Sequence, residues 1–287
     1  MTLCIAWKKN DVINLASDSR ATIGGSRQFD HCIKVSKLPI HIKGPLNEND
    51  QYEHQPYNGS IGIATAGNFL NASTVKDNLT ISLSSLQSIP GITDASMVGI
   101  CKLIKKYFEF ISEKLTNQIF KKGHSKFFVI GHCPIQEKSK AFLFTFDKKS
   151  SKVKYKYEEI LKSDESINFL GSGKTKAENM FRSIDKTPPL EILRDIIHDD
   201  DIESVGGSIQ FGKIKYYSFS NYGVIDYVKD DDKKKFASFT HLNGMKMLNS
   251  NFMIKKDQFH IQIPYIDPFK KQTDELIEKG YMAKDSL

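Results

Sequence analysis

The stretch that decides the fold is residues 2–20, TLCIAWKKNDVINLASDSR. Residues 3–8 and 12–17 are short runs of β-forming apolar residues separated by a Lys-Asn-Asp turn, so we expect a β-hairpin. Thr2 stands directly behind Met1, and Asp18 follows the second run. A threonine at a free N-terminus carries its own base, because its α-amine lies beside its hydroxyl. Thr2 is therefore a candidate nucleophile.

The bulk composition limits the classes of partner. With 287 residues and 39% hydrophobic content, the chain suits one large domain, with or without an appendage. The net charge is +7, but the 41 basic and 34 acidic residues are interspersed, and no basic stripe contains aromatic residues. We therefore expect no nucleic-acid partner. No apolar run reaches the roughly 18 residues of a membrane helix. Polar residues 8–11 interrupt the first apolar run, which excludes a signal peptide and predicts a cytoplasmic protein without a membrane partner.

The cysteines and histidines show no ligand spacing. Cys4, Cys32, Cys101 and Cys133 lie far apart, with no C-x-x-C pair. This distribution favours reduced, individually buried thiols over disulfides or a zinc site. The eight histidines form no H-x-x-x-H or H-E-x-x-H pattern. We predict neither a metal nor a cofactor.

The remaining pattern predicts alternating blocks of strands and helices. Further strand-like runs lie at 33–39, 59–67, 127–132, 141–146, 153–157 and 167–173, and two more lie within 208–220. Helical patterns cover 69–87, 93–123 (with Thr93 or Asp94 as N-cap), 174–184 and 189–198. Residues 44–58 are polar and contain two prolines, which predicts an inserted loop. This order indicates an α+β fold with two sheets packed face to face and helices outside.

The spacing of the charged residues narrows the interpretation. Asp18 follows Thr2 by sixteen residues and Lys34 follows it by thirty-two, and Gly67 closes a strand within A-T-A-G-N. This arrangement resembles the proteasome β-subunit family of N-terminal nucleophile (Ntn) hydrolases, with its bacterial relatives HslV and Anbu. The segments T-L-C-I-A, A-S-D-S-R-A-T and A-G-N look closest to the Anbu branch. The resemblance is densest over residues 2–67 and extends loosely to about residue 225.

The resemblance implies a four-layer α-β-β-α sandwich over residues 1–228. Residues 229–287 remain as a C-terminal extension, which we expect to pack on the domain or at an oligomer interface. It also implies a homo-oligomer, either a ring or a helical stack, that encloses the sites. The natural substrates and any unfoldase partner stay open at this point.

The same resemblance assigns a catalytic centre. Thr2 becomes the nucleophile after loss of Met1, and its α-amine, with a reference pKa of about 7.7–8.0, acts as base. Lys34 adds positive charge that favours an alkoxide-like transition state, and Asp18 fixes Lys34. Arg20 supports this pair. The Gly67 N–H serves as the oxyanion donor.

The substrate would lie extended between the strand at Ala21–Thr22 and the turn at Gly67, held by backbone pairing. By resemblance, the first specificity pocket is formed by Ala21, Cys32, Ser36, Thr65 and Phe69. Because this lining has no charged floor, we expect a preference for an uncharged side chain.

Two later motifs need separate interpretation. G-S-G-K-T at 171–175 suggests a phosphate loop, but Asn168 stands where that loop needs its first glycine, so we do not predict nucleotide binding. The family comparison instead places Ser172 in the active-site network. Residues 201–207, D-I-E-S-V-G-G, resemble the family's Asp-x-x-Ser-Gly-Gly with one extra residue before the glycines. We therefore expect Asp201 to be a supporting residue, although a register held by Gly206 and Gly207 would put Ile202 in its place.

Three functions fit this sequence. The first is a self-compartmentalised threonine peptidase, a hydrolase acting on peptides or unfolded proteins. The second is a catalytically silent proteasome-like scaffold or assembly protein, which retention of Met1 would favour. The third is an Ntn amidohydrolase acting on small amides, because Ntn folds host several such activities. Substrate panels separate the first from the third.

Overall fold

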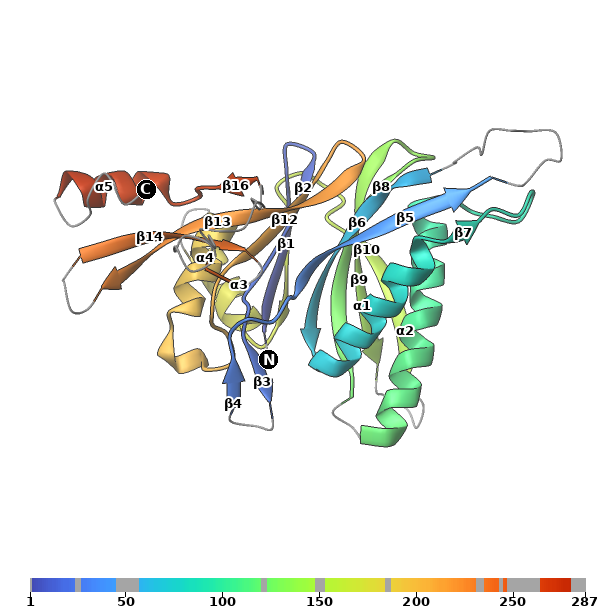
Figure 1. Ribbon diagram of the computed structural model, residues 1–287, viewed down its shortest axis with the longest axis horizontal. Coiled ribbons are helices and arrows are strands. Elements are labelled where there is room, and N and C mark those ends of the chain that lie inside the picture. Colours follow the sequence, from blue (N-terminus) through green and yellow to red (C-terminus); the bar gives the residue numbers. More distant parts are fainter. Residues whose placement is uncertain are drawn as a thin grey trace, which may run out of the picture.

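The computed structural model describes residues 2–23, 27–44, 57–119, 123–147, 153–183, 187–230, 235–242, 245–246 and 264–279. These residues form an α+β fold in which a 14-stranded mixed sheet carries helices on both sides, with α1 and α2 on one side and α3 and α4 on the other (Figure 1). Strands β3 and β4 form a separate two-stranded sheet.

The strands are β1 (Leu3–Lys9), β2 (Val12–Ser17), β3 (Ala21–Ile23), β4 (Arg27–Phe29), β5 (Val35–Lys43), β6 (Tyr57–Gly67), β7 (Leu86–Gln87), β8 (Ser125–Cys133), β9 (Lys138–Asp147), β10 (Lys154–Ile160), β11 (Ile167–Gly171), β12 (Gln210–Lys215), β13 (Ser218–Asp230), β14 (Lys235–Leu242), β15 (Met245–Lys246) and β16 (Tyr265–Ile266). The helices are α1 (Phe69–Leu83), α2 (Met97–Ile119), α3 (Lys174–Ser183), α4 (Pro189–Ile197), the 3₁₀-helix η2 (Asp200–Ile202) and α5 (Lys270–Glu278).

The predicted N-terminal hairpin is confirmed. Strands β1 and β2 pair antiparallel, with Cys4 opposite Ser17 and Lys9 opposite Val12. Asn10 and Asp11 form the turn with φ of 50° and 59°, the left-handed pair of angles that a two-residue turn of type I′ needs. The hairpin therefore brings Thr2, just before β1, next to Asp18, just after β2.

Three clusters of buried residues hold the fold together. The first lies between α1 and α2 and the strands β5, β6, β8 and β9. The second lies between α3 and α4 and the strands β1, β11 and β12. The third lies between the two halves of the sheet and includes Cys4, Leu15, Ala64 and Phe128. The halves meet where β6 and β13 pair in parallel at Ser60 and Ser218.

The helix boundaries differ from the sequence prediction in two places. The helix predicted over 69–87 ends at Leu83, where Ser84 Oγ donates to the Ile81 carbonyl and competes with the helical hydrogen-bond ladder. The N-cap predicted at Thr93 or Asp94 is wrong. Helix α2 begins at Met97, and Ser96 Oγ accepts the Gly99 N–H at 3.2 Å, which is the N-cap hydrogen bond.

The polar insert predicted over 44–58 lies mostly outside the described residues. Tyr57 and Asn58 belong to β6, which pairs with β5 from Ile42 opposite Tyr57 onward. The strand therefore begins earlier than the sequence pattern indicates.

The described part of the C-terminal extension packs on the rest of the chain. Strand β13 runs past residue 228 and pairs with β14 and, in parallel, with β16. Phe269 is 1% exposed within the second cluster, and Leu276 and Ile277 of α5 pack against that cluster. These contacts attach α5 to the side of the molecule that carries α3 and α4 (Figure 1).

None of the described helices has both the length and the apolar character that crossing a membrane requires. All four cysteines are buried thiols without a disulfide.

Candidate active site

Thr2 is enclosed by the glycine turn that follows β11. The Thr2 N–H donates to Ser172 Oγ at 3.2 Å, and the Gly173 N–H donates to the Thr2 carbonyl at 3.4 Å. Gly171 has φ of +110°, and a Cβ there would lie 1.9 Å from the Thr2 carbonyl oxygen. Glycine is required at this position both for the backbone angle and for the close approach. The turn thus fixes Thr2, which is 3% exposed.

Asp18 is a fully buried carboxylate that accepts four hydrogen bonds. Its Oδ1 accepts from the Leu3 N–H at 3.0 Å and from Lys34 Nζ at 2.8 Å. Its Oδ2 accepts from the N–H groups of Arg20 and Gly206, each at 3.2 Å. Burying a charge is costly unless it is paired and hydrogen-bonded, and here both conditions are met.

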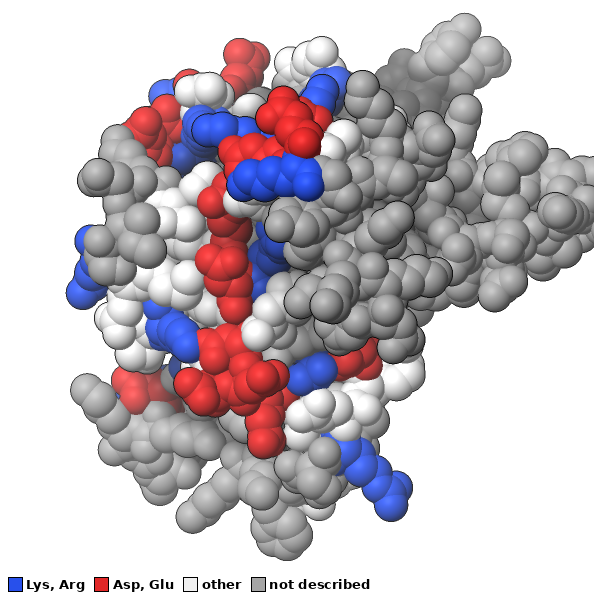
Figure 2. Space-filling model, turned by 90° about the vertical axis from the view of Figure 1, so that its left-hand side faces the viewer, with Lys and Arg blue, Asp and Glu red and all other residues white. Residues whose placement is uncertain are grey.

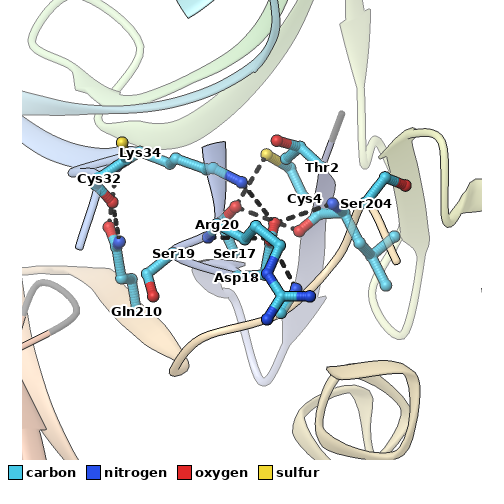
Figure 3. A network of polar contacts seen from close by, with 12 residues as sticks. Thr2, Cys4, Ser17, Asp18, Ser19, Arg20, Cys32, Lys34, Ser204 and Gln210 are labelled. Carbon is cyan, nitrogen blue, oxygen red and sulfur yellow. Dashed lines mark hydrogen bonds and ion pairs between the residues drawn. The ribbon is translucent and has the colours of Figure 1, made fainter. Parts of the chain in front are cut away.

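Lys34 is held in position by Gln210, a residue of β12. Gln210 Oε1 accepts the N–H groups of Lys34 and Val35 at 2.9 and 3.0 Å, and Gln210 Nε2 donates to the Cys32 carbonyl at 2.5 Å. The Lys34 side chain then extends toward Asp18, next to Thr2 and Cys4 (Figure 3). The sequence alone did not identify Gln210, because a lone glutamine 176 positions away has no spacing signal.

A cavity of about 90 Å³ opens at Thr2. Its walls are Thr2, Arg20, Ala21, Thr22, Lys34, Thr65, Ala66, Gly67, Asn68, Phe69 and Ala72. Among the residues predicted to bind substrate, Ala21, Thr22, Thr65 and Phe69 line this cavity. The lining therefore joins the strand after β2 with the end of β6 and the start of α1.

Cys32 and Ser36 do not line this cavity. The Cys32 N–H donates to the Ser19 carbonyl, and its side chain is buried. Ser36 pairs with Ile63 within the β5–β6 ladder, about 7 Å along the strand from Lys34 at the usual rise per residue. The wall also includes Ala66, Asn68 and Ala72, which the sequence analysis did not name as substrate-binding residues.

Gly67 lies on the cavity wall at the end of β6, with φ of +107°. A Cβ there would lie 2.9 Å from the carbonyl oxygen of His124, the residue just before β8. Asn68 then caps α1, because its Oδ1 accepts the Asn71 N–H at 2.9 Å. A helix thus begins directly beside the cavity.

Of the two polar residues in the 201–207 motif, Ser204 contacts the site and Asp201 does not. Ser204 Oγ lies 2.9 Å from Ser172 Oγ, and Gly206 binds Asp18. Val205 is the extra residue between Ser204 and the two glycines. Its side chain is 1% exposed and packs in the second cluster, so the core accommodates the insertion. The exposed Asp201 makes no hydrogen bond or ion pair with these residues in the described part of the chain; its N–H donates to Asp199 Oδ1 at 3.1 Å.

Cys4 lies beneath the site without reactive character. Its Sγ donates to the Thr65 carbonyl and contacts Ser17 Oγ, both at 3.3 Å. Burial raises the pKa of this thiol to about 12, so it stays protonated at neutral pH. Among the described residues, no group of three or more His, Cys, Asp or Glu side chains could hold a metal ion.

The fold belongs to a recognisable class. No family model matches the sequence, and no curated protein matches it. Solved structures share the fold. The helical assembly of the Anbu complex from Pseudomonas aeruginosa is 15% identical over 96% of this chain and 96% of its own, with a TM-score of 0.51. A mutant of Anbu from Hyphomicrobium sp. strain MC1 is 13% identical over 76% of this chain and 85% of its own, with a TM-score of 0.51. The chain therefore has the proteasome-like fold of the Anbu proteins.

Proposed function

We propose that this chain is a threonine-type endopeptidase in which Thr2, made N-terminal by removal of Met1, hydrolyses peptide bonds. The observation that carries this proposal is the shared cavity: Thr2, Lys34 and Gly67 line the same wall. The Lys34 ammonium is held there by a buried carboxylate at 2.8 Å. A hydroxyl, a fixed cation and an exposed backbone turn in one cavity form the arrangement that acyl transfer needs.

In the first half of the reaction, Thr2 Oγ bonds to the carbonyl carbon of the substrate. The hydroxyl proton passes to the Thr2 α-amine through a water molecule. Lys34 stabilises the developing negative charge, and the Gly67 N–H donates to the oxyanion. The C–N bond then breaks, the leaving amine takes the proton, and an ester to Thr2 remains.

In the second half, water adds to the ester under the same base, and the carboxylic acid leaves Thr2 regenerated. Ser172 orients the amine, because its Oγ accepts a hydrogen bond from Thr2 N at 3.2 Å. The contact of Ser172 with Ser204 fixes that hydroxyl in turn.

The cavity favours an uncharged substrate side chain. Both cations in its wall are already paired, Lys34 with Asp18 and Arg20 with Asp30. The remaining wall is formed by small or apolar groups such as Ala21, Thr65 and Phe69. A peptide library that selected strictly for Arg, Lys, Asp or Glu would contradict this preference.

Four further features belong to the proposal. The three buried clusters support a four-layer α-β-β-α sandwich over residues 1–228, with 229–287 as an extension. We place the protein in the cytoplasm because its thiols are unpaired. The helical assembly of the Anbu complex supports a homo-oligomer, a ring or a helical stack, that encloses the sites. For the extension, and for the insert predicted at 44–58, most of which lies outside the described residues, we propose that they cap an interface or narrow access to the cavity. Unchanged assembly and activity after deletion of the extension would contradict this.

The proposal is tested by hydrolysis of a panel of fluorogenic peptides and a panel of small amides. Peptide cleavage by the wild type and by Thr93→Ala, but not by Thr2→Ala, supports the peptidase. Thr93 is an exposed threonine that does not line the cavity, so it controls for loss of a hydroxyl. Cleavage of small amides alone assigns an amidohydrolase. No Thr2-dependent cleavage, with Met1 retained, assigns a scaffold.

A further inference from the structure

Arg20 forms a bidentate ion pair with Asp30, a residue that the sequence pattern does not single out. Its Nε lies 2.7 Å from Asp30 Oδ1, and its Nη2 donates to Asp30 Oδ2 at 2.9 Å. Its remaining terminal nitrogen, Nη1, donates to the Glu203 carbonyl at 3.0 Å. The planar guanidinium therefore joins Asp30, the residue directly after β4, to the segment after η2 in one fixed geometry.

Asp30 is itself anchored to the same region. Ser19 Oγ donates to the Asp30 carbonyl, and the Ser208 N–H donates to Ser19 Oγ at 2.8 Å. The hydrogen bond and charge of Arg20 hold the pKa of the Asp30 carboxyl below its usual range, so Asp30 is ionised at neutral pH. Asp30 is thus linked to residues 203–208 twice: its carboxylate through Arg20 and its carbonyl through Ser19.

The segment 203–208 supplies three contacts of the active site. Ser204 reaches Ser172, and the Gly206 N–H donates to Asp18. The Ser19 N–H donates to the Gly206 carbonyl at 3.2 Å. A Cβ on Gly206 would lie 2.2 Å from Arg20 Cζ, so the guanidinium rests directly on this backbone. Displacing Arg20 therefore displaces the segment that completes the hydrogen bonding of Asp18.

Asp201, the acid that the sequence motif suggests for this role, lies on the surface. Exposed acids are frequent in this part of the chain, with Asp195, Asp200, Asp201 and Glu203 all exposed. Asp and Glu side chains gather in a band on the side of the molecule that carries α3 and α4 (Figure 2). Such surface carboxylates contribute little to the placement of a buried group.

We propose that Asp30, and not Asp201, is the positioning carboxylate of the site: through Arg20 it fixes segment 203–208 against Asp18 and Ser172. This assignment rests on the proposed function for its effect on catalysis, although the placement of the segment does not depend on activity. Asp30 does not touch the reacting atoms. It acts through Arg20 and the Gly206 N–H.

The test compares Asp30→Asn with its matched control Asp201→Asn, because both remove one carboxylate charge without a change of size. We expect Asp30→Asn to slow covalent adduct formation between Thr2 and an epoxyketone about tenfold, the effect of losing a charge-assisted hydrogen bond. The KM for peptide should change less than this rate, because Asp30 itself is not part of the cavity wall and reaches it only through Arg20. Asp201→Asn should match the wild type, and Asp30→Glu should restore part of the rate.

Amide hydrogen exchange supplies a readout that does not require activity. We expect the amides of Gly206 and Ser208 to exchange faster in Asp30→Asn than in the wild type, and unchanged in Asp201→Asn. Arg20→Lys keeps the positive charge but cannot bind Asp30 and Glu203 together, so it should give the same increase if Asp30→Asn does not fold.

The two proposals fail in different ways. If the wild type never reacts at Thr2, the proposed function is wrong, and the exchange data still decide the placement of segment 203–208. If the wild type reacts while Asp30→Asn and Asp201→Asn are indistinguishable in rate and in exchange, the role of Asp30 is wrong.

Discussion

The Lys34 ammonium lies 2.8 Å from Asp18 Oδ1, and the two side chains are 5% and 0% exposed. The pair sits beneath Thr2, because Leu3, the next residue, donates its N–H to the same carboxylate oxygen. A buried pair of this kind is weak evidence for stability, since desolvation offsets the attraction. Its value lies in fixing a cation beside a hydroxyl.

Removing one partner of this pair should destabilise the fold strongly. We expect Lys34→Met to lower the free energy of unfolding by about 3 kcal/mol, because it leaves the Asp18 charge buried without a cation. The double variant Asp18→Asn/Lys34→Met should recover part of this loss. Urea denaturation measures both, with Lys37→Met as the control, because Lys37 is an exposed lysine of β5, the strand that begins directly after Lys34. Equal losses in the single and double variants would show that the charge of Asp18 is not the cause.

Gly171→Ala should displace Thr2. The new Cβ meets the Thr2 carbonyl, and a left-handed backbone costs an L-residue about 1–2 kcal/mol before any clash. Gly91 is the matched control, because it also has positive φ, at +71°, but no atom lies within 4 Å of its Cβ position. Gly171→Ala should therefore lose more stability than Gly91→Ala in thermal unfolding, and it alone should lose reaction at Thr2. Equal losses would contradict the close contact.

The Arg20–Asp30 pair predicts an acid limit. The hydrogen bond from Arg20, with smaller contributions from the charges of His31 and Lys34, lowers the pKa of Asp30 in the folded state. A carboxyl whose folded pKa is depressed stabilises the protein above its unfolded pKa of about 3.9. That stability is lost as the pH falls below this value through the folded pKa. Asp30→Asn should flatten the fall in unfolding free energy below about pH 4, whereas an unchanged slope would argue against the pair.

The buried thiols should be inert in the folded protein. Burial raises the pKa of Cys4 to about 12 and raises the pKa of Cys101 as well. Because the thiolate is the reactive form, iodoacetamide at pH 8 should label neither residue until the protein is unfolded in urea. Peptide mapping after alkylation gives the answer. Rapid labelling of Cys4 in the native protein would mean that the floor of the site is open.

Local patterns in the sequence predict a large share of this fold. The alternation and turn at residues 3–17 predict the β1–β2 hairpin, and Pro188 and Pro189 mark the start of α4. Resemblance adds Thr2, Asp18 and Lys34, which the structure places together. Spacing alone does not predict that they meet, since that depends on Gln210 of β12, which pairs with β2 and holds Lys34 beside the hairpin.

The features that the sequence does not reveal depend on long-range packing. Gln210 binds Lys34 from 176 positions away, and Asp30 binds Arg20, ten positions before it; neither has a local motif. The short sheet of β3 and β4 is local, but its three residue pairs are too few to give a strand pattern in the sequence. The start of α2 was misplaced because Asp94 forms a turn with Ser96, and Ser96 takes the cap. Two competing polar residues so close together leave the choice to the tertiary structure.

The central claim, that Thr2 is a working N-terminal nucleophile, is tested most directly by intact mass and N-terminal sequencing before and after treatment with a peptide epoxyketone. We predict loss of Met1 and one adduct, located on Thr2 and absent in Thr2→Ala. A retained Met1, with no adduct on Thr2 under any condition, would contradict the account and leave a proteasome-like scaffold.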